Sequence, residues 1–273
     1  MPKNHQLMQY YKALRSILLL FLMALLPGLG QAQPDSPYHL SFEREAYYMG
    51  GGLSVTLLGF YLKANTPRLK LSDLDLGKVN SFDRIATTYS SEKADRLSDH
   101  TMNLSIGLSL FLLANEKSRN DFGKVSLLFI ETMLWNQGFT DIIKSTSRRP
   151  RPYIFDENID PAKVLSTNDR ASFVSGHTSG AASAAFFFAR TFSDYYPDSP
   201  WRPYIWAISV TLPALTGYLR VRGGQHYPTD VMAGYVLGGA IGYLIPTLHK
   251  KPLKIKGLSL RPARQGLHLS FRF

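Results

Sequence analysis

The chain has 273 residues, a formal net charge of +11 and no cysteine. This length allows one large helical domain or two small ones. The lack of cysteine excludes a disulfide framework and a thiolate metal site, but it assigns no compartment. A basic chain can meet nucleic acid, anionic lipid or phosphate esters. Because no nucleic-acid-binding motif occurs among the basic residues, we expect no nucleic-acid partner.

Residues 1–32 have the pattern of an export signal. Lys3, Lys12 and Arg15 precede an apolar run, and small residues end the segment at Ala32, as in a cleavable signal peptide. An uncleaved N-terminal anchor is the alternative, although the apolar run is short for a full membrane span. Both interpretations place the protein in a bacterial-type cell envelope, and cleavage leaves a charge of +8.

Apolar segments then recur along residues 33–250, each longer than a typical strand. This pattern predicts an all-α fold, a helical bundle of about six core helices. Residues 63–100 are rich in Asp, Ser and Lys, and we expect a loop with short helical turns there. The expected helical segments are Met49–Leu62, Met102–Ala114, Val125–Phe139, Thr178–Ala189, Pro203–Leu219 and Val231–Leu248.

The last of these segments carries Gly234, Gly238 and Gly242 at a spacing of four residues. Glycines at this spacing line one face of a helix and allow a neighbouring helix to come close. We interpret this stripe as a packing feature without a chemical role.

Membrane insertion is left open by the sequence. Most segments are apolar for only ~11–18 residues, at or below the roughly 20 that a bilayer requires, and the fifth and sixth are the best candidates. Basic residues gather near 117–124 and 250–256, and the positive-inside rule makes both places cytoplasmic. In this orientation the first helix starts on the cytoplasmic side, whereas cleavage of an export signal would leave that start outside. Either residues 16–29 are not a simple signal, one helix does not cross, or the whole domain is exported.

The C-terminal tail, residues 251–273, is basic and changes its periodicity. Apolar residues alternate with polar ones from Leu258 to Phe273, which predicts two short strands joined around Pro262 to Gly266. Two strands cannot close a membrane barrel, so we do not interpret the tail as one.

The segment "KSTSRRPRP", from Lys144 to Pro152, places four cations within eight residues after an apolar helix. Lysine supplies a point charge and arginine a two-pronged donor, a combination that suits phosphate. When the segment is taken alone, a solvated basic loop or a membrane-surface anchor is the better explanation.

The segment "SFVSGHTSG" surrounds His177 with small residues just before an Ala-rich helix. The free amides at a helix start attract anions, and a histidine there can give or take a proton. The alternative is an N-capping Ser-Gly turn with an incidental histidine.

A third segment, "LRVRGGQHYPTD", places Arg220 six residues before His226 and Asp230 four residues after it. Pro228 suits a first helical turn, so the histidine and the aspartate can share one side of a helix start. A carboxylate bonded to one imidazole nitrogen leaves the other free to react. A helix-capping aspartate beside a surface histidine is the alternative, and two histidines without a third ligand argue poorly for metal.

The order and spacing of these three segments resemble the type 2 phosphatidic acid phosphatase superfamily, which includes bacterial non-specific acid phosphatases and vanadium haloperoxidases. The family pattern runs Lys-x6-Arg-Pro, then Pro-Ser-Gly-His, then Ser-Arg-x5-His-x3-Asp. Val174 replaces the family proline and Leu219 the family serine, and neither is a usual catalytic group. The resemblance covers about residues 45–248. The matching positions are Lys144, Arg151, Pro152, Ser175, Gly176, His177, Arg220, His226 and Asp230.

The resemblance implies a metal-independent phosphatase without a cofactor. In this scheme His226 attacks phosphorus, Asp230 orients it, and His177 protonates the leaving alcohol and then activates water. The expected ligands of the phosphoryl oxygens are Lys144, Arg151, Ser175, Gly176 and Arg220. By the same resemblance the substrate is a phosphate ester or pyrophosphate, and the apolar helices favour a lipid.

Two other functions fit parts of the sequence. A vanadate-dependent haloperoxidase would use the same pocket with a histidine ligating vanadate, although we identify no halide site. A non-catalytic envelope protein could bind anionic lipid through the basic tail and residues 148–151. Arg148, Arg149 and Arg222 lie outside the motif, and we expect them to bind headgroups or to be solvated.

Overall fold

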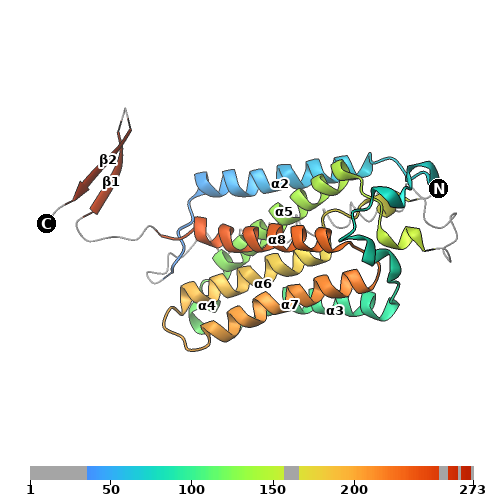
Figure 1. Cartoon of the computed structure of the whole chain (residues 1–273). Coiled ribbons are helices and arrows are strands. Elements are labelled where there is room, and N and C mark those ends of the chain that lie inside the picture. Colours follow the sequence, from blue (N-terminus) through green and yellow to red (C-terminus); the bar gives the residue numbers. More distant parts are fainter. Residues whose placement is uncertain (1–35, 157–165, 252–257, 264–265, 272–273) are drawn as a thin grey trace.

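The computed structural model describes residues 36–156, 166–251, 258–263 and 266–271. Within these ranges the chain forms a bundle of long helices, which confirms the predicted all-α class (Figure 1). The predicted signal or anchor, residues 1–32, lies outside the described residues. The long helices are α2 (Phe42–Ala64), α3 (Glu92–Leu108), α5 (Phe122–Ser147), α6 (Gly176–Tyr195), α7 (Arg202–Arg222) and α8 (Pro228–Leu248).

Shorter elements connect these helices. The segment between α2 and α3 contains three 3-10 turns, η1 (Leu71–Asp73), η2 (Leu76–Lys78) and η3 (Arg84–Thr88). After α3 come η4 (Ser109–Ala114) and α4 (Glu116–Asn120), and two further turns, η5 (Pro152–Phe155) and η7 (Asn168–Arg170), lie between α5 and α6. All six apolar segments of the sequence are therefore helical.

One boundary differs from the expectation. The polar stretch 63–100 was expected to be loop with short turns, but α3 already begins at Glu92. Ser91 caps this helix, since its hydroxyl accepts a hydrogen bond from the amide of Ala94 at 3.2 Å. The apolar pattern starts only near Met102, because the first turns of α3 face a polar site rather than the core.

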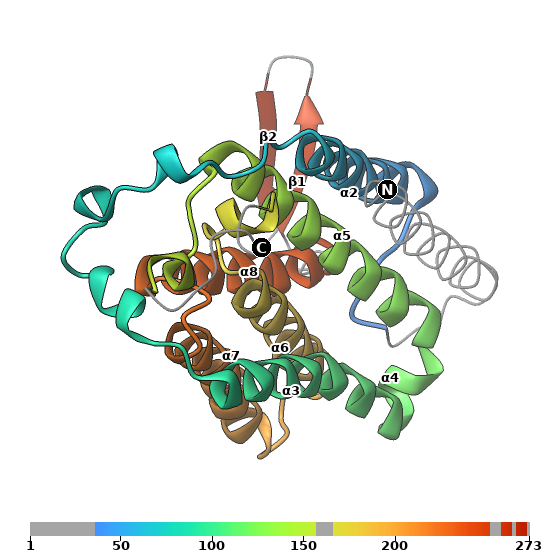
Figure 2. The same ribbon diagram turned by 90° about the vertical axis from the view of Figure 1, so that its right-hand side faces the viewer.

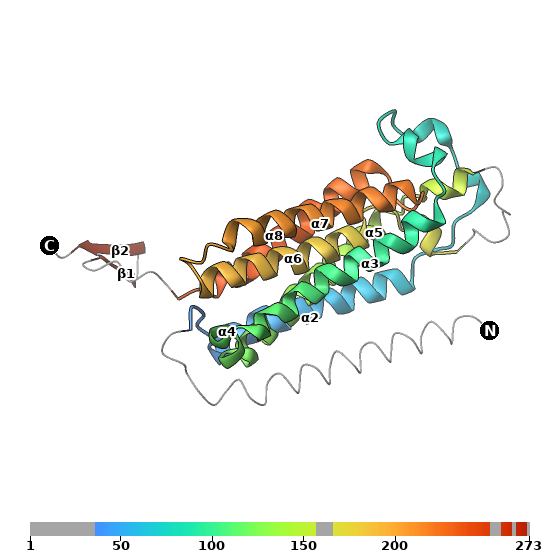
Figure 3. The same ribbon diagram turned by 90° about the horizontal axis from the view of Figure 1, so that it is seen from below.

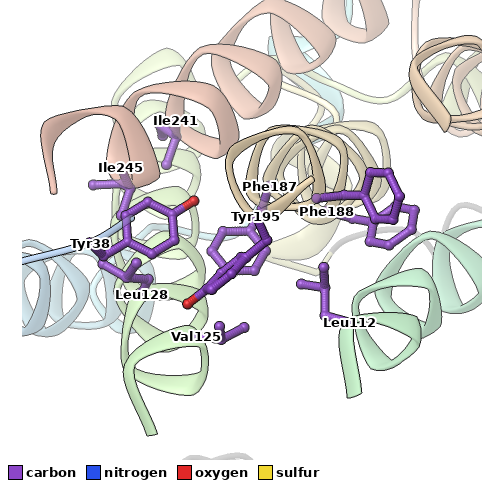
Figure 4. Close-up of a cluster of buried hydrophobic side chains, with 10 residues drawn as sticks. Tyr38, Leu112, Val125, Leu128, Phe187, Phe188, Tyr195, Ile241 and Ile245 are labelled. Atoms are coloured by element: carbon purple, nitrogen blue, oxygen red, sulfur yellow. The ribbon is translucent and has the colours of Figure 1, made fainter. Parts of the chain in front are cut away.

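Helix α6 lies at the centre of the bundle and contacts α3, α5, α7 and α8 (Figures 2 and 3). Its sequence suits this position, because Ala181, Ala182, Ala184 and Ala185 are fully buried and small enough to admit several neighbours. Larger side chains fill the space towards its C-terminal end (Figure 4). That cluster consists of Tyr38, Leu112, Val125, Leu128, Phe187, Phe188, Phe192, Tyr195, Ile241 and Ile245.

The glycine stripe of α8 packs directly against the backbone of α6. A Cβ atom would lie 2.6 Å from the Ser175 carbonyl oxygen at Gly234 and 2.0 Å from that of Ser179 at Gly238. At Gly242 the corresponding distance, to the Ser183 carbonyl oxygen, is 2.2 Å. The repeat of four residues is thus present on both helices, which confirms the predicted packing function of these glycines.

The tail forms an antiparallel hairpin of β1 (Leu258–Ala263) and β2 (Gly266–Phe271), as the alternation predicted. Pro262 lies inside β1 opposite Leu267 rather than in the connection. Ahead of the hairpin, the chain segment before α2 meets the end of α8 through an isolated bridge between Tyr38 and Lys250.

Candidate active site

The predicted site residues meet at one end of the bundle. Helices α5 and α7 end there and α3, α6 and α8 begin there, at the right of Figure 1 and towards the viewer in Figure 2. The packing of α6 against α8 joins the two histidine segments, since the amide of Ser175 donates to the carbonyl of Asp230 at 2.9 Å. A helix start therefore lies beside each histidine.

His226 lies between α7 and α8 with only 1% of its surface exposed. Its Nε2 faces the Arg151 guanidinium, with 3.5 Å between Nε2 and Nη1. Burial, followed by the positive charges of Arg151 and Lys144, lowers the pKa of His226 well below the ordinary histidine value. The imidazole is thus neutral near pH 7, and its lone pair allows it to act as a nucleophile.

Asp230 lies beside His226 without a hydrogen bond to it. Its Oδ2 is 3.6 Å from His226 Nδ1, beyond hydrogen-bond range, and that nitrogen has no hydrogen-bond partner among the described residues. Asp230 accepts instead from Ser172 Oγ at 2.5 Å and from the Tyr227 amide at 3.0 Å. His226 and Asp230 thus lie side by side, as their spacing predicted, but the carboxylate oxygens of Asp230 accept hydrogen bonds from other donors.

Arg149 is a residue of the candidate site that the motif did not identify. Its Nη1 donates to Asp230 Oδ1 at 2.6 Å and its Nη2 to Asp83 Oδ2 at 2.7 Å. The guanidinium also lies 3.9 Å from the ring centroid of Tyr227. Arg149 therefore fixes Asp230 from the side opposite to Ser172. In the sequence nothing separates it from the adjacent Arg148, which is exposed and ends α5 with a φ of 49°.

Lys144 and Arg151 are held as buried cations. Lys144 is 8% exposed, and its Nζ donates to the carbonyl of Ala171 at 2.6 Å. Arg151 is 6% exposed and donates to the backbone and side chain of both Asn168 and Gln225. Burial is the first cause that lowers the pKa of each group. An anion in the site would relieve this cost.

Arg220, in the last turn of α7, is anchored by the start of α3. Its Nη1 bonds to Asp95 Oδ1 and donates to Ser98 Oγ at 3.2 Å. Asp95, Ser98 and Asp99 share one face of α3, and the sequence analysis did not select them. The serine cap at Ser91 was the signal that could have moved the helix start to include them.

His177 is the more open histidine, with 31% of its side chain exposed. Its Nε2 lies 2.8 Å from Asp99 Oδ1. Burial, and then the charge of Arg220, lowers the pKa of His177 to about 4, while Asp99 acts in the opposite direction. The positive potential that depresses this pKa is the same potential that a phosphate would neutralise.

Ser175 and Gly176 form the start of α6. The Ser175 hydroxyl caps the helix by accepting from the amide of Thr178 at 3.4 Å. The first amides of a helix have no partner within it, so those at Gly176 and His177 are suited to an anion. All eight predicted site residues thus lie around the same helix ends.

Comparison with known protein families agrees with this geometry. Residues 125–254 match the family model described as the PAP2 superfamily. The matched segment is slightly less than half of the chain. It contains every residue that the motifs selected, from Lys144 to Asp230, and the predicted family resemblance is confirmed.

A curated relative is the lipid A 4'-phosphatase of Porphyromonas gingivalis, which is 26% identical over 144 residues. The match covers 52% of this chain and 58% of that protein, so the chain spans little more than half of its relative.

Two solved structures are similar in outline. A transmembrane PAP2-type phosphatidylglycerolphosphate phosphatase from Bacillus subtilis has a TM-score of 0.46 at 20% identity, covering 75% of this chain and 98% of that one. LpxE of Aquifex aeolicus has a TM-score of 0.42 at 23% identity, covering 65% of this chain and 98% of that one.

Proposed function

We propose that the protein is a phosphatase that hydrolyses phosphate monoesters or pyrophosphates of lipids through a phosphohistidine intermediate. The observation that carries this proposal is the buried His226, which is kept neutral while three cations, Lys144, Arg151 and Arg220, surround the same space. A neutral nucleophile beside fixed positive charge suits attack on a phosphoryl group, whose equatorial oxygens carry the negative charge.

In the first step, Nε2 of His226 attacks phosphorus, the N–P bond forms and the bond from phosphorus to the ester oxygen breaks. Nε2 is the reacting atom because it faces Arg151, whereas Nδ1 faces Asp230. Attack places positive charge on the imidazole, and the Asp230 carboxylate at 3.6 Å stabilises it. A bound phosphate neutralises the positive potential that lowers the pKa of His177, so His177 takes up a proton in the substrate complex and donates it to the leaving alkoxide.

In the second step, the now neutral His177 takes a proton from water, and the resulting hydroxide attacks the phosphohistidine. The N–P bond breaks, inorganic phosphate leaves and both histidines return to their starting states. The cations and the first amides of α6 hold the phosphoryl oxygens in both steps. The scheme needs no metal or other cofactor, since these groups supply the positive charge.

Exposed apolar side chains support a lipid substrate and a membrane location. Large apolar and aromatic residues lie exposed along the outer faces of the long helices, a feature of surfaces that meet lipid or another protein. Among the described residues, α8 alone is long and apolar enough to cross a bilayer, whereas α7, the other expected candidate, is long enough but not apolar enough. The exposed residues include Leu57, Leu58, Tyr61, Leu104, Phe111, Ile208, Leu215, Tyr218, Met232, Val236 and Leu244.

The curated match to a lipid A 4'-phosphatase supports the same substrate class. We place the protein in the cell envelope, either membrane-associated with its active site facing the periplasm or as a soluble periplasmic domain. Phosphatidate, phosphatidylglycerophosphate, isoprenoid pyrophosphates and lipid A phosphates are the substrates to compare.

The test is phosphate release by the purified full chain from these lipids and from soluble monoesters, with His226→Ala alongside wild type. We expect the variant to fold, judged by its melting midpoint, and to lose turnover and the acid-labile phosphoenzyme formed by wild type. Full activity in His226→Ala would refute the proposed nucleophile. Halide oxidation that depends on vanadate, without phosphate release, would instead establish a haloperoxidase.

A further inference from the structure

A second group of chemically reactive side chains lies at the opposite end of α8. His249 follows the last turn of α8, whereas the candidate active site adjoins its first turn. The 21 residues of α8 separate the two places by about 30 Å. The group consists of Glu45 from α2, Glu131 from α5 and His249, whose ligand atoms all lie within 4.8 Å of one another.

The imidazole of His249 is fixed so that one nitrogen faces the two carboxylates. Its Nδ1 lies 2.7 Å from the carbonyl oxygen of Ile245, which can only accept, so Nδ1 carries a hydrogen. Its Nε2 then points to Oε2 of Glu45 at 3.2 Å and to Oε2 of Glu131 at 3.3 Å. A backbone acceptor on the other nitrogen is the usual support of a metal-ligating histidine.

The two carboxyl groups are buried, and three of their four oxygens lack a hydrogen-bond donor among the described residues. The side chains of Glu131 and His249 are fully buried, and that of Glu45 is 13% exposed. Both oxygens of Glu131 and Oε1 of Glu45 lack a hydrogen-bond partner among the described residues. Arg44 is the neighbouring cation, with its Nε 3.7 Å from Oε1 of Glu45. Buried acceptors without donors are costly, so either a proton or a positive ion between the two carboxyl groups would stabilise them.

The spacing of these atoms fits a divalent transition-metal ion. Zinc binds imidazole nitrogen and carboxylate oxygen at about 2.0–2.2 Å, and tetrahedral geometry then separates two ligand atoms by about 3.3–3.6 Å. Of the two distances from Nε2, 3.3 Å lies at the lower edge of this range and 3.2 Å just below it. An ion would also satisfy the carboxylate oxygens that one proton on Nε2 leaves without a donor.

We propose that Glu45, Glu131 and His249 bind a divalent transition-metal ion, of the zinc class, as a structural site that joins α2, α5 and the end of α8. The ion is remote from the candidate active site and takes no part in the proposed reaction. This inference does not rest on the proposed function, and each can fail without the other.

The test uses the full chain, purified without metal and equilibrated with Zn²⁺ and, separately, Co²⁺. We expect about one tightly held ion per chain, a Co²⁺ absorption spectrum typical of nitrogen and oxygen ligands, and a melting midpoint that falls when a chelator removes the ion. The affinity for the ion should fall by at least about tenfold in Glu131→Gln and in His249→Gln. Loss of a residue that only supports a metal ligand already costs about this much.

Glu43→Gln is the matched control, because Glu43 is an exposed glutamate two residues before Glu45 on the same helix. It should bind the ion like wild type. Wild type that holds no ion and melts alike with and without chelator would overturn the proposal in favour of a proton on Nε2. Equal binding by wild type and the two site variants would also overturn it, as an adventitious ion only. The chelator measurement on wild type decides the matter even if a variant fails to fold.

Discussion

Replacing Gly238 by alanine tests whether the close contact between α6 and α8 holds the bundle together. The added Cβ would lie 2.0 Å from the Ser179 carbonyl oxygen, whereas carbon and oxygen in ordinary contact are about 3.3–3.6 Å apart. The two helices must therefore separate by more than about 1 Å. Overpacking of this kind costs about 1–3 kcal/mol, and the higher helix propensity of alanine offsets about 0.5–1 kcal/mol of it.

The midpoints of these two ranges leave a net loss of about 1.3 kcal/mol, which corresponds to a melting midpoint lower by about 2.5–5 °C for a domain of this size. The assay is thermal unfolding of both proteins in one detergent at one scan rate, because unfolding of such proteins is often irreversible. Gly180→Ala is the control, since a Cβ at Gly180 in α6 meets nothing within 4 Å. If Gly238→Ala melts with wild type, or Gly180→Ala loses as much, the packing argument is wrong.

Three further outcomes follow from the site. Arg149→Lys should lower the free energy of unfolding by about 1.5–3 kcal/mol and reduce kcat, because lysine cannot pair with two carboxylates at once; unchanged kcat would show that Asp230 needs no such support. The pKa of His177, about 4, should rise on adding vanadate and fall in Asp99→Asn, as measured by NMR of labelled histidine; no movement would contradict the electrostatic account. Arg222→Gln should keep kcat within about twofold, because Arg222 is exposed and stacks 4.3 Å from the ring centroid of a tyrosine; a large loss in phosphate release would give it a role in the site.

Stability towards acid gives a related expectation. The folded-state pKa of His177 lies below the ordinary histidine value of 6.5, so the unfolded chain binds a proton more readily between about pH 6.5 and 4. The contribution of this histidine to stability is therefore present above pH 6.5 and is lost as the pH falls towards 4. His177→Gln should lose less of its melting midpoint than wild type between pH 7.5 and 5. An equal loss in both proteins would contradict this assignment.

The helices were predictable because burial imposes a periodicity that local sequence displays. Val231–Leu248 is apolar over its whole length, and the structure has α8 over Pro228–Leu248. The start of α3 was not predictable from hydropathy, since its first turns present Asp95 and Asp99 to other polar groups. These aspartates pair with charged and polar groups on neighbouring helices, and the hydropathy of a single segment does not show where such partners lie.

The sequence by itself determined which residue types form the candidate site, because a phosphate needs cations, amides and imidazoles whose order along the chain is recognisable. Only the tertiary structure decided how they are paired. It placed Arg149, and not His226, within hydrogen-bond distance of Asp230. It also brought His249 to Glu45 and Glu131, which lie 204 and 118 positions earlier in the chain. Such pairings change when helices shift by a few tenths of an ångström. The positions of the helices follow from the packing of the whole fold, so residue identity and spacing alone do not predict them.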